Sequence, residues 1–455
     1  MLSAGILITG NEVLSAKTKD TNGPFMGMHL RKIGMAVTAS MMCGDNELEL
    51  LDCLDYLTKK SEVILMTGGL GPTSDDLTAQ VVSNFFGIPT EFNNEAWNSC
   101  ADFFIKAGRK EIPESNKKQA YLPKNCKLLP NELGTAVGFV VSGEKNGKQI
   151  KVFSMPGVPY EMEKMFLQYV LPVLEDKSFF PVVKYWQVFF MGESFMQNAI
   201  NSAEKNLQVR FPNSSVSYQA HPYYVSYSVT IFADNVEKKQ FYEEYLNKEF
   251  NNEVEKAFHE HILFSEDKKV PVYLYEKLKQ NKLSISFIET TNSGFLSKEF
   301  SQFSNDYDVF KGGIVYPSQA FINNILNLTK QESELFGTNP EIYVAKAAKN
   351  MLELSQSQIC LAEIGIPKEQ NNHDNHELGS FYFTLAIVKN KIFDLELVAK
   401  KLAIYNWKLI EPKISDEIDI FGCYVKNNPR HSREIQQTRA TLFLLCSLAK
   451  ILSSY

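Results

Sequence analysis

The stretch that decides the fold reads Glu62-Val63-Ile64-Leu65-Met66-Thr67-Gly68-Gly69-Leu70-Gly71-Pro72-Thr73-Ser74-Asp75-Asp76-Leu77-Thr78. Its first residues form a short apolar run that is typical of a buried strand. Leu77, Val81 and Phe85 then recur at the spacing of one helix face, and Gly87 follows them as a helix end. A strand that enters a helix through a glycine turn is typical of an α/β sheet with crossover helices.

Similar patterns flank this stretch on both sides. Apolar runs alternate with segments of helical periodicity, as expected when helices cover a sheet. We expect strands at Ile6–Ile8, Val37–Met42 and Lys151–Ser154. We expect helices after Thr21 or Asn22, over Glu47–Lys59 and from about Tyr160. The first part of the chain is therefore predicted to be an α/β sandwich.

The rest of the chain divides into two further parts. Trp186–Phe190 and Tyr224–Phe232 indicate strands of a small α+β module, and the charged run Glu266–Lys269 indicates a linker after it. Leu283–Ile288 and Ile435–Leu452 then indicate a strand and a terminal helix of an α/β domain. We predict three domains, at residues 1–168, 169–260 and 261–455.

Composition bounds the class of protein. The chain has 455 residues, of which 44% are hydrophobic and 22% charged, so it has enough apolar side chains for several cores. Its 47 Lys and Arg against 53 Asp and Glu give a net charge of −6, which offers no basic field for nucleic acid. The seven cysteines show no zinc spacing, and the N-terminus shows no signal peptide or membrane span. We expect a cytoplasmic protein with neither a nucleic-acid nor a membrane partner.

The glycine turn indicates a phosphate site. Gly68, Gly69 and Gly71 let backbone N–H groups approach an anion, and the helix that follows adds the partial positive charge of its N-terminus. Thr73 adds a hydroxyl to the same turn. We therefore expect these four residues to cradle phosphate.

Carboxylates beside that turn indicate a cation. Asp75 and Asp76 would repel a naked phosphate, but they suit a divalent cation that bridges carboxylate and phosphate oxygens. The simpler alternative is that Thr73 or Ser74 caps the helix and the two aspartates complement its dipole.

Four loops with glycine and polar groups follow predicted strands. In open α/β sheets, ligands bind beyond the carboxyl ends of the strands, so these loops should meet on one rim. The loops are Gly10–Glu12, Gly44–Asn46, Gly68–Asp76 and Pro156–Pro159. Glu12 thereby joins Asp75 and Asp76 as a candidate metal ligand or catalytic base.

Several motifs in a fixed order resemble the CinA family. They are Thr9–Glu12, Asp20–Asn22, Gly68–Thr78, Asn116–Ala120, Pro130-Asn131 with Gly134–Gly138, and Met155–Met162. The resemblance implies a three-layer α/β/α molybdopterin-binding-like domain of MoaB/MogA type, a KH-like middle module and a C-terminal domain related to nicotinamide mononucleotide deamidases. This chain departs from the family in having Asn11 where an Asp is usual and Val137 where a Pro is usual.

The same resemblance implies an activity for the N-terminal domain. It implies an ADP-ribose pyrophosphatase that depends on a divalent metal ion, Mg²⁺ or Co²⁺, and yields AMP and ribose 5-phosphate. It also places Asn22, Asn116, Gln119 and Gly157 at the nucleotide and implies a homodimer. The alternative is a protein that binds a nucleotide or pterin without chemistry, which the loss of a carboxylate at Asn11 favours.

The C-terminal domain departs further from its family. Deamidases carry Ala-Glu-Ser-Cys-Thr-Gly-Gly at a strand-to-helix turn, where this chain has Ile288–Gly294, with Glu289 retained and Thr290 in place of the serine nucleophile. Gly312 and Gly313 retain a Gly-Gly strand, but Pro317–Ile322 lacks the expected lysine, and Glu363–Pro367 replaces Thr-Gly-Ile-Ala-Gly-Pro. We expect this domain to keep its fold and to lack deamidase activity.

Overall fold

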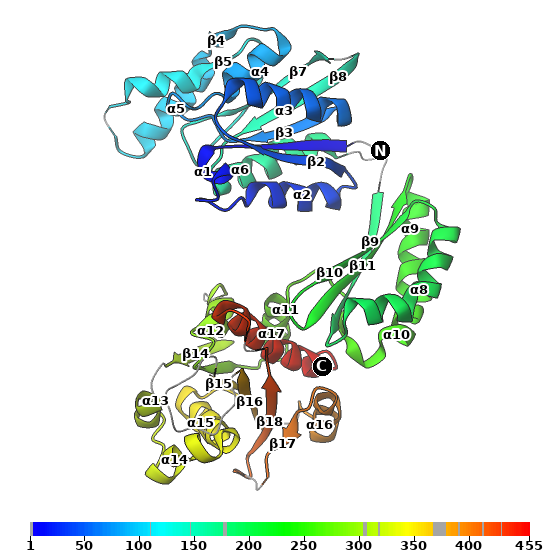
Figure 1. The fold of residues 1–455 in the computed structure, drawn as a ribbon, viewed down its shortest axis with the longest axis vertical. Coiled ribbons are helices and arrows are strands. Elements are labelled where there is room, and N and C mark those ends of the chain that lie inside the picture. The colour runs from blue at the N-terminus through cyan, green and yellow to red at the C-terminus, as the bar shows by residue number, and fades with distance from the viewer. Residues whose placement is uncertain are drawn as a thin grey trace. The chain divides into compact units, whose positions relative to one another are not determined.

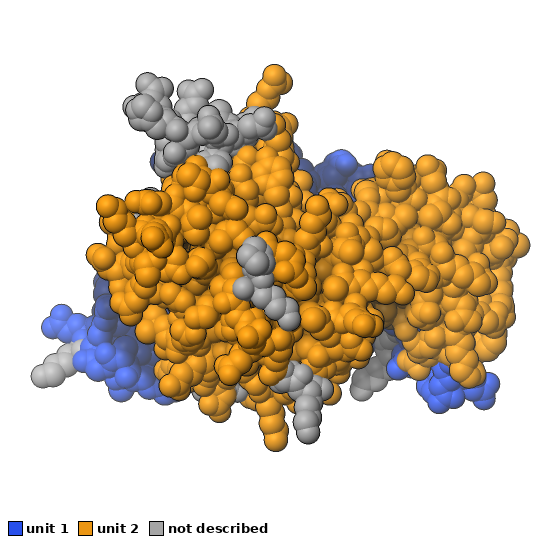
Figure 2. Space-filling view, turned by 90° about the horizontal axis from the view of Figure 1, so that it is seen from below, with its two compact units in different colours: residues 1–182, 232–240 blue, residues 183–231, 241–455 orange. Residues whose placement is uncertain are grey.

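The computed structural model (Figure 1) describes residues 3–109, 111–145, 147–175, 180–303, 307–316, 319–366, 379–389, 392–411, 414–428 and 430–455. The chain divides into two compact units, coloured separately in Figure 2: residues 1–182 with 232–240, and residues 183–231 with 241–455. The domain boundaries expected at residues 168 and 260 stay predictions. Within the described ranges, no helix is both long and apolar enough to cross a bilayer.

A six-stranded sheet forms the centre of the first unit. Its strand order is β2-β1-β3-β8-β7-β6. The strands are β1 (Ser3–Thr9), β2 (Ala36–Cys43), β3 (Val63–Thr67), β6 (Lys127–Leu129), β7 (Gly138–Lys145) and β8 (Lys148–Met155). The first four strands in this order are parallel to one another. β7 pairs antiparallel with β8, and β6 pairs antiparallel with β7. The carboxyl ends of β2, β1, β3 and β8 therefore meet at one edge of the sheet.

Helices cover both faces of this sheet. On one face, Leu7, Leu54 and Val81 share a core in which α3 (Glu47–Lys60) and α4 (Thr78–Phe86) pack on the strands. On the other face, Ile6 and Met26 share a second core, which includes α2 (Asn22–Lys32) and α6 (Pro159–Met165). Adjacent residues of β1 thus enter opposite cores, as the period of two along a strand requires. This confirms the three-layer α/β/α architecture.

Smaller elements complete the first unit. They are α1 (Asn11–Leu14), β4 (Thr90–Phe92), α5 (Asn94–Lys106), η1 (Glu114–Ala120), β5 (Tyr121–Pro123), η2 (Phe166–Val170) and α7 (Leu171–Leu174). Strands β4 and β5 pair as a separate antiparallel ladder.

A four-stranded sheet with order β10-β11-β9-β12 follows. Its strands are β9 (Phe180–Phe189), β10 (Ser214–Ala220), β11 (Tyr224–Ala233) and β12 (Ile262–Phe264). The helices of this region are α8 (Glu193–Arg210), α9 (Val236–Tyr245), η3 (Leu246–Phe250), α10 (Asn251–Phe258) and η4 (His259–His261). The region is an α+β module, as the sequence predicts.

The last sheet has the order β14-β13-β15-β16-β18-β17. Its strands are β13 (Ile285–Glu289), β14 (Phe310–Val315), β15 (Ile359–Ile366), β16 (Ser380–Val388), β17 (Lys408–Leu409) and β18 (Ile418–Lys426). One core joins it to α11 (Val270–Gln280), α12 (Phe295–Ser301), α16 (Leu395–Ala403) and α17 (Arg433–Leu452). A second core joins it to α13 (Gln319–Ile325), α14 (Lys330–Thr338) and α15 (Pro340–Ser355). The expected α/β fold of this part is therefore present.

Candidate functional site

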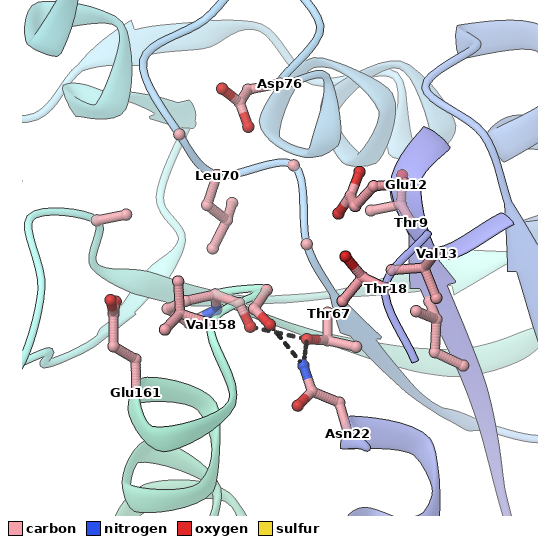
Figure 3. Close-up of a pocket in the computed structure, with 18 of the residues that line it drawn as sticks. Thr9, Glu12, Val13, Thr18, Asn22, Thr67, Leu70, Asp76, Val158 and Glu161 are labelled. Atoms are coloured by element: carbon pink, nitrogen blue, oxygen red, sulfur yellow. Dashed lines mark hydrogen bonds between the residues drawn. The ribbon is translucent and has the colours of Figure 1, made fainter. Parts of the chain in front are cut away.

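A hollow of about 500 Å³ opens where β1, β3 and β8 end (Figure 3). All four loops that the sequence places on one rim contribute to its wall, with Gly10, Asp45, Gly68 and Pro156 among the lining residues. The parallel arrangement of the strands explains this convergence, since their carboxyl ends share one edge.

Ten of the eleven residues predicted for the N-terminal site line this hollow. They are Glu12, Asn22, Gly68, Gly69, Gly71, Thr73, Asp75, Asp76, Gln119 and Gly157. Asn116 is not in the lining. It donates from Nδ2 to Oε1 of Gln119 at 2.8 Å, and Gln119 donates from Nε2 to the carbonyl of Leu70 at 3.2 Å. Asn116 therefore supports the glycine turn through Gln119.

Two glycines allow neighbouring loops to touch. Gly68 has φ +106°, and a Cβ added there would lie 2.2 Å from the carbonyl oxygen of Thr9. A Cβ added at Gly157 would lie 3.3 Å from Cα of Gly68. The turn after β3 thus passes against the loop after β8 and the end of β1, and no larger residue fits at Gly68.

The glycine turn leaves three consecutive amides unpaired. The N–H of Gly68 donates to Met155 at 3.0 Å, and the N–H of Thr73 donates to Oδ2 of Asp76 at 2.8 Å. Between them, the N–H groups of Gly69, Leu70 and Gly71 donate to no acceptor in the described part of the chain. Consecutive unpaired amides in a wall of the hollow can bind an anion.

Asp75 and Asp76 converge on one hydroxyl. Oγ1 of Thr73 contacts Oδ1 of Asp75 and lies 2.5 Å from Oδ2 of Asp76. The hydrogen bond from Thr73 lowers the pKa of Asp75. A hydroxyl carries a single proton, so it can serve only one of the two carboxylates at a time. The other carboxylate is left facing like charge, which a cation would relieve.

The capping alternative for this turn is wrong. Helix α4 begins at Thr78, and its N-cap residue is Leu77, which has no capping side chain. Thr73 and Ser74 precede the helix by several residues, so Thr73 is left to organise the two aspartates.

The carboxylates fit a hard cation only in part. Among the residues that the structure describes, no group of three or more His, Cys, Asp or Glu side chains could hold a metal ion, so Glu12 does not complete a site with Asp75 and Asp76. Mg²⁺ is commonly held by one or two carboxylates together with substrate phosphates, and that is the donor set this turn offers. Donors that are all oxygen also suit Mg²⁺ better than Co²⁺.

Glu161 is a site residue that the sequence reasoning missed. It lies in the first turn of α6 and lines the hollow, and only 9% of its surface is exposed. Nδ2 of Asn131 donates to Oε2 at 2.7 Å, and burial raises the pKa of Glu161. In the view of Figure 3, Glu161, Asp76 and Glu12 lie on three sides of the hollow. Asn131 and Glu161 both belong to the quoted motifs, but the sequence does not indicate that Glu161 is buried against Asn131.

Asn22 joins three elements at the floor of the hollow. Its Nδ2 donates to Oγ1 of Thr67 and to the carbonyl of Gly157, both at 2.9 Å, and Thr67 donates to the carbonyl of Pro156 at 2.7 Å (Figure 3). Asp20 accepts from the backbone N–H of Asn22 at 2.9 Å and so fixes the start of α2. Asn22 thus holds the loops after β3 and β8 together.

Asn11 pairs with the neighbouring loop. Its Oδ1 accepts from the N–H of Asp45 at 3.2 Å, and Oδ2 of Asp45 accepts from the N–H of Asn11 at 3.0 Å. Asn11 is not in the lining, whereas Asp45 is. Asn11 therefore contacts the hollow through Asp45, and both hydrogen bonds use groups that an Asp at this position would also offer.

In the second unit, two buried carboxylates occupy the turn after β13. Glu289 accepts from the N–H groups of Leu296 at 2.8 Å and Ser297 at 2.9 Å. Glu363 of β15 accepts from the N–H groups of Thr290 at 2.7 Å and Asn292 at 2.8 Å. The amides that could stabilise an oxyanion at this turn are therefore taken by the protein's own side chains.

The hydroxyl of Thr290 lies beside Glu363. Its hydroxyl contacts the backbone carbonyl of Glu363 at 3.2 Å and a carboxylate oxygen of Glu363 at 3.3 Å. Gly312 and Gly313 lie in β14 beside β13, and a Cβ at Gly313 would lie 2.3 Å from Oγ of Ser297. Pro317, Ser318 and Pro367, which belong to the eroded motifs, lie outside the described residues.

Comparisons with known families match both parts of the chain. Residues 5–176 match the family described as probable molybdopterin binding domain, and residues 267–403 match the family described as CinA C-terminal domain.

Relatives extend the match over most of the chain. A competence-damage inducible protein from Acetivibrio thermocellus is 29% identical over 408 residues, which cover 89% of this chain and 95% of that relative. The protein of the same name from Clostridium perfringens is 28% identical over 85% of this chain and 91% of its own length. Among solved structures, protein CinA of unknown function from Thermoplasma acidophilum is 30% identical and covers 36% of this chain and 94% of its own, with a TM-score of 0.33.

Proposed function

Because this chain belongs to the CinA family, we propose that its first unit hydrolyses the diphosphate of an ADP-ribose-type nucleotide to AMP and ribose 5-phosphate. The observation that carries the proposal is the run of unpaired amides at Gly69, Leu70 and Gly71 beside Asp75 and Asp76, all in the wall of one hollow. Amides that bind phosphate and carboxylates that suit a cation are the two requirements of diphosphate chemistry.

The chain's own residues divide the work. The amides of the glycine turn bind phosphate oxygens and stabilise the charge that grows on them as the bond to phosphorus changes. Glu161 accepts a proton from the attacking water, because burial raises its pKa and, among the described residues, Asn131 donates to just one of its two oxygens. Asn22 and Gln119 keep the turn and the neighbouring loop in place.

The cation is part of this proposal. Asp75 and Asp76 would hold it, with phosphate oxygens and water as the remaining ligands. When bound, a divalent cation neutralises diphosphate charge and makes water more acidic.

Product analysis tests the proposal. Purified protein is incubated with ADP-ribose and Mg²⁺ or Co²⁺, with excess chelator in a parallel sample, and the nucleotides are separated by chromatography. We expect AMP to accumulate in the metal samples and not with chelator. The proposal would be contradicted if calorimetry showed that ADP-ribose binds and chromatography showed that it is not cleaved.

Binding of ADP-ribose without cleavage would instead indicate a protein that binds a nucleotide or pterin without chemistry. One observation favours this function: the described residues gather no group of three metal-binding side chains. Under this alternative, the amides of the turn would still hold a phosphate.

For the second unit we propose that deamidase activity is absent. Support comes from Glu363, which takes the N–H groups of Thr290 and Asn292, and from Thr290 itself, which stands where the family motif has its serine. Ammonia release from nicotinamide mononucleotide tests this. Turnover by the wild-type protein that Thr290→Ala abolishes would show that threonine replaces the serine.

A further inference from the structure

Two lysines lie beside a hollow of about 400 Å³ in the second unit, far in sequence from the glycine turn. They are Lys401 of α16 and Lys450 near the end of α17. Apolar side chains contribute Leu397, Ile404 and Ile262 to the lining. Charged or polar side chains add Glu255, His259, Glu260 and Lys400.

The two lysines differ in how well their donors are satisfied. Lys401 donates to the carbonyls of Lys450 at 3.0 Å and Ile451 at 3.4 Å, and to Oγ of Ser454, so it closes the end of α17. Lys450 is only 7% exposed, and among the described residues its ammonium has one acceptor, the carbonyl of Ile262 at 2.9 Å. An ammonium has three N–H donors, so Lys450 retains donors for a further partner.

Within the described part of the chain, neither lysine forms an ion pair. Across the described ranges, no carboxylate lies within 4 Å of the ammonium of Lys401 or Lys450, although Glu260 acts on Lys450 from farther away. Burial, with the neighbouring Lys401, lowers the pKa of Lys450 to about 8, so most of it stays charged at pH 7. Burying an unpaired charge is costly, and such charges in proteins are normally paired.

We propose that this hollow binds a small organic carboxylate, whose oxygens accept hydrogen bonds from Lys450 while a short apolar part lies against Leu397 and Ile404. The lining carries three lysines and two glutamates, so it favours a single negative charge over a phosphate dianion. The apolar wall favours an anion with a short hydrocarbon part over an inorganic ion.

The competing explanation is purely structural. Lys401 is fully accounted for by the end of α17. Lys450 is not, because one carbonyl does not satisfy a buried ammonium. The proposal therefore depends on Lys450, and the test is designed around it.

Ligand-observed NMR titration with butyrate tests the proposal on the full-length protein. Butyramide, which has the same shape without the charge, is the ligand control. Lys450→Met removes the charge and keeps an apolar stem, while Lys408→Met removes an exposed lysine outside the hollow. We expect saturable butyrate binding that Lys450→Met weakens tenfold or more and Lys408→Met leaves unchanged, because hydrogen bonds to charged groups are strong.

Two further readouts guard against a folding artefact. If Lys450→Met unfolds, Leu397→Glu places a negative charge beside the two lysines and should abolish butyrate binding. In the wild-type protein, affinity should fall as the pH rises past the pKa of Lys450, about 8, with Lys400, Lys401, His259, Glu255 and Glu260 as the other groups in the lining. The proposal would be overturned if butyrate did not bind saturably or if butyramide bound equally well. It would also be overturned if Lys450→Met and Leu397→Glu both bound butyrate with the affinity of the wild-type protein.

Discussion

Asp76 combines two roles in one side chain. It accepts from the N–H and the hydroxyl of Thr73, and it offers a carboxylate to a cation beside the unpaired amides. We predict that Asp76→Ala lowers metal-dependent turnover of ADP-ribose by about 100-fold or more, since both the shape of the turn and a cation ligand are lost. The matched control is Asp102→Ala, an exposed aspartate on α5 outside the hollow. Equal turnover in the two variants would remove Asp76 from the site.

Glu161 gives a prediction about pH. A base must be deprotonated to act, so a raised pKa moves the acidic limb of the pH–rate profile upward. Glu161→Gln should lower kcat by about 100-fold and remove the acidic limb of the profile. The control is Glu163→Gln, at a residue outside the hollow, which should keep the wild-type kcat and the acidic limb. A Glu161→Gln enzyme that keeps the wild-type limb would show that Glu161 only positions the loop of Asn131.

At the scale of elements, the crossing of β1 with the turn after β3 depends on Gly68. A side chain there meets Thr9 at 2.2 Å with φ at +106°, so Gly68→Ala should lower the free energy of unfolding of the first unit by about 2 kcal/mol or more. Gly108→Ala is the control, because its φ of +71° is also positive but a Cβ would meet nothing within 4 Å. Urea unfolding measures the free energy of unfolding of both variants. Equal decreases in the two variants would mean that the close approach of Gly68 to Thr9 does not contribute to stability.

Glu363 gives a second element-scale prediction. Burial raises its pKa to about 7 in the fold, against 4.5 for an ordinary glutamate. The folded state then binds more protons than the unfolded state between these values, so the stability of the second unit should fall as the pH rises from about 4.5 to about 7 and level off above it. Glu363→Gln should flatten this part of the profile. Parallel profiles for wild type and variant in urea unfolding would contradict the assignment.

Elements with a clear apolar period were predictable from sequence, while three-residue strands were not. β3, α3 and α4 were predictable because their apolar residues recur with a clear period and Gly87 ends the helix in a left-handed conformation. β4, β5 and β6 have three residues each, too few to show any period. β7 was missed, although the sequence Asn146-Gly147 between it and β8 is typical of a two-residue hairpin turn.

The candidate site was predictable for a related reason. Its loops follow strands whose order the α/β pattern implies, so their meeting could be expected. Glu161 could not be singled out, because its burial depends on Asn131, thirty residues earlier, and on Gly134, where a Cβ would lie 2.1 Å from its carboxylate. That Glu12 does not join Asp75 and Asp76 likewise depends on loop geometry that spacing does not carry.

At the scale of the whole molecule, we predict a homodimer, since symmetric dimers are the commonest assembly of soluble enzymes. Light scattering at micromolar concentration should give twice the 51.7 kDa of one chain. A monomeric mass would count against it.

Limited proteolysis addresses the predicted domains at 1–168, 169–260 and 261–455. Stable fragments should correspond to these three parts. A stable fragment that spans residues 100 to 300 without interruption would show that the division is wrong.

The central claim is that the first unit directs water onto the phosphorus of a nucleotide diphosphate. Incubation of the full-length protein with ADP-ribose and Mg²⁺ in ¹⁸O-labelled water, followed by ³¹P NMR, tests it most directly. We predict AMP and ribose 5-phosphate in equal amounts, with one ¹⁸O bound to the phosphorus of one product and the label absent in a chelated sample. Intact ADP-ribose after prolonged incubation, or products whose phosphorus carries no label, would contradict the claim.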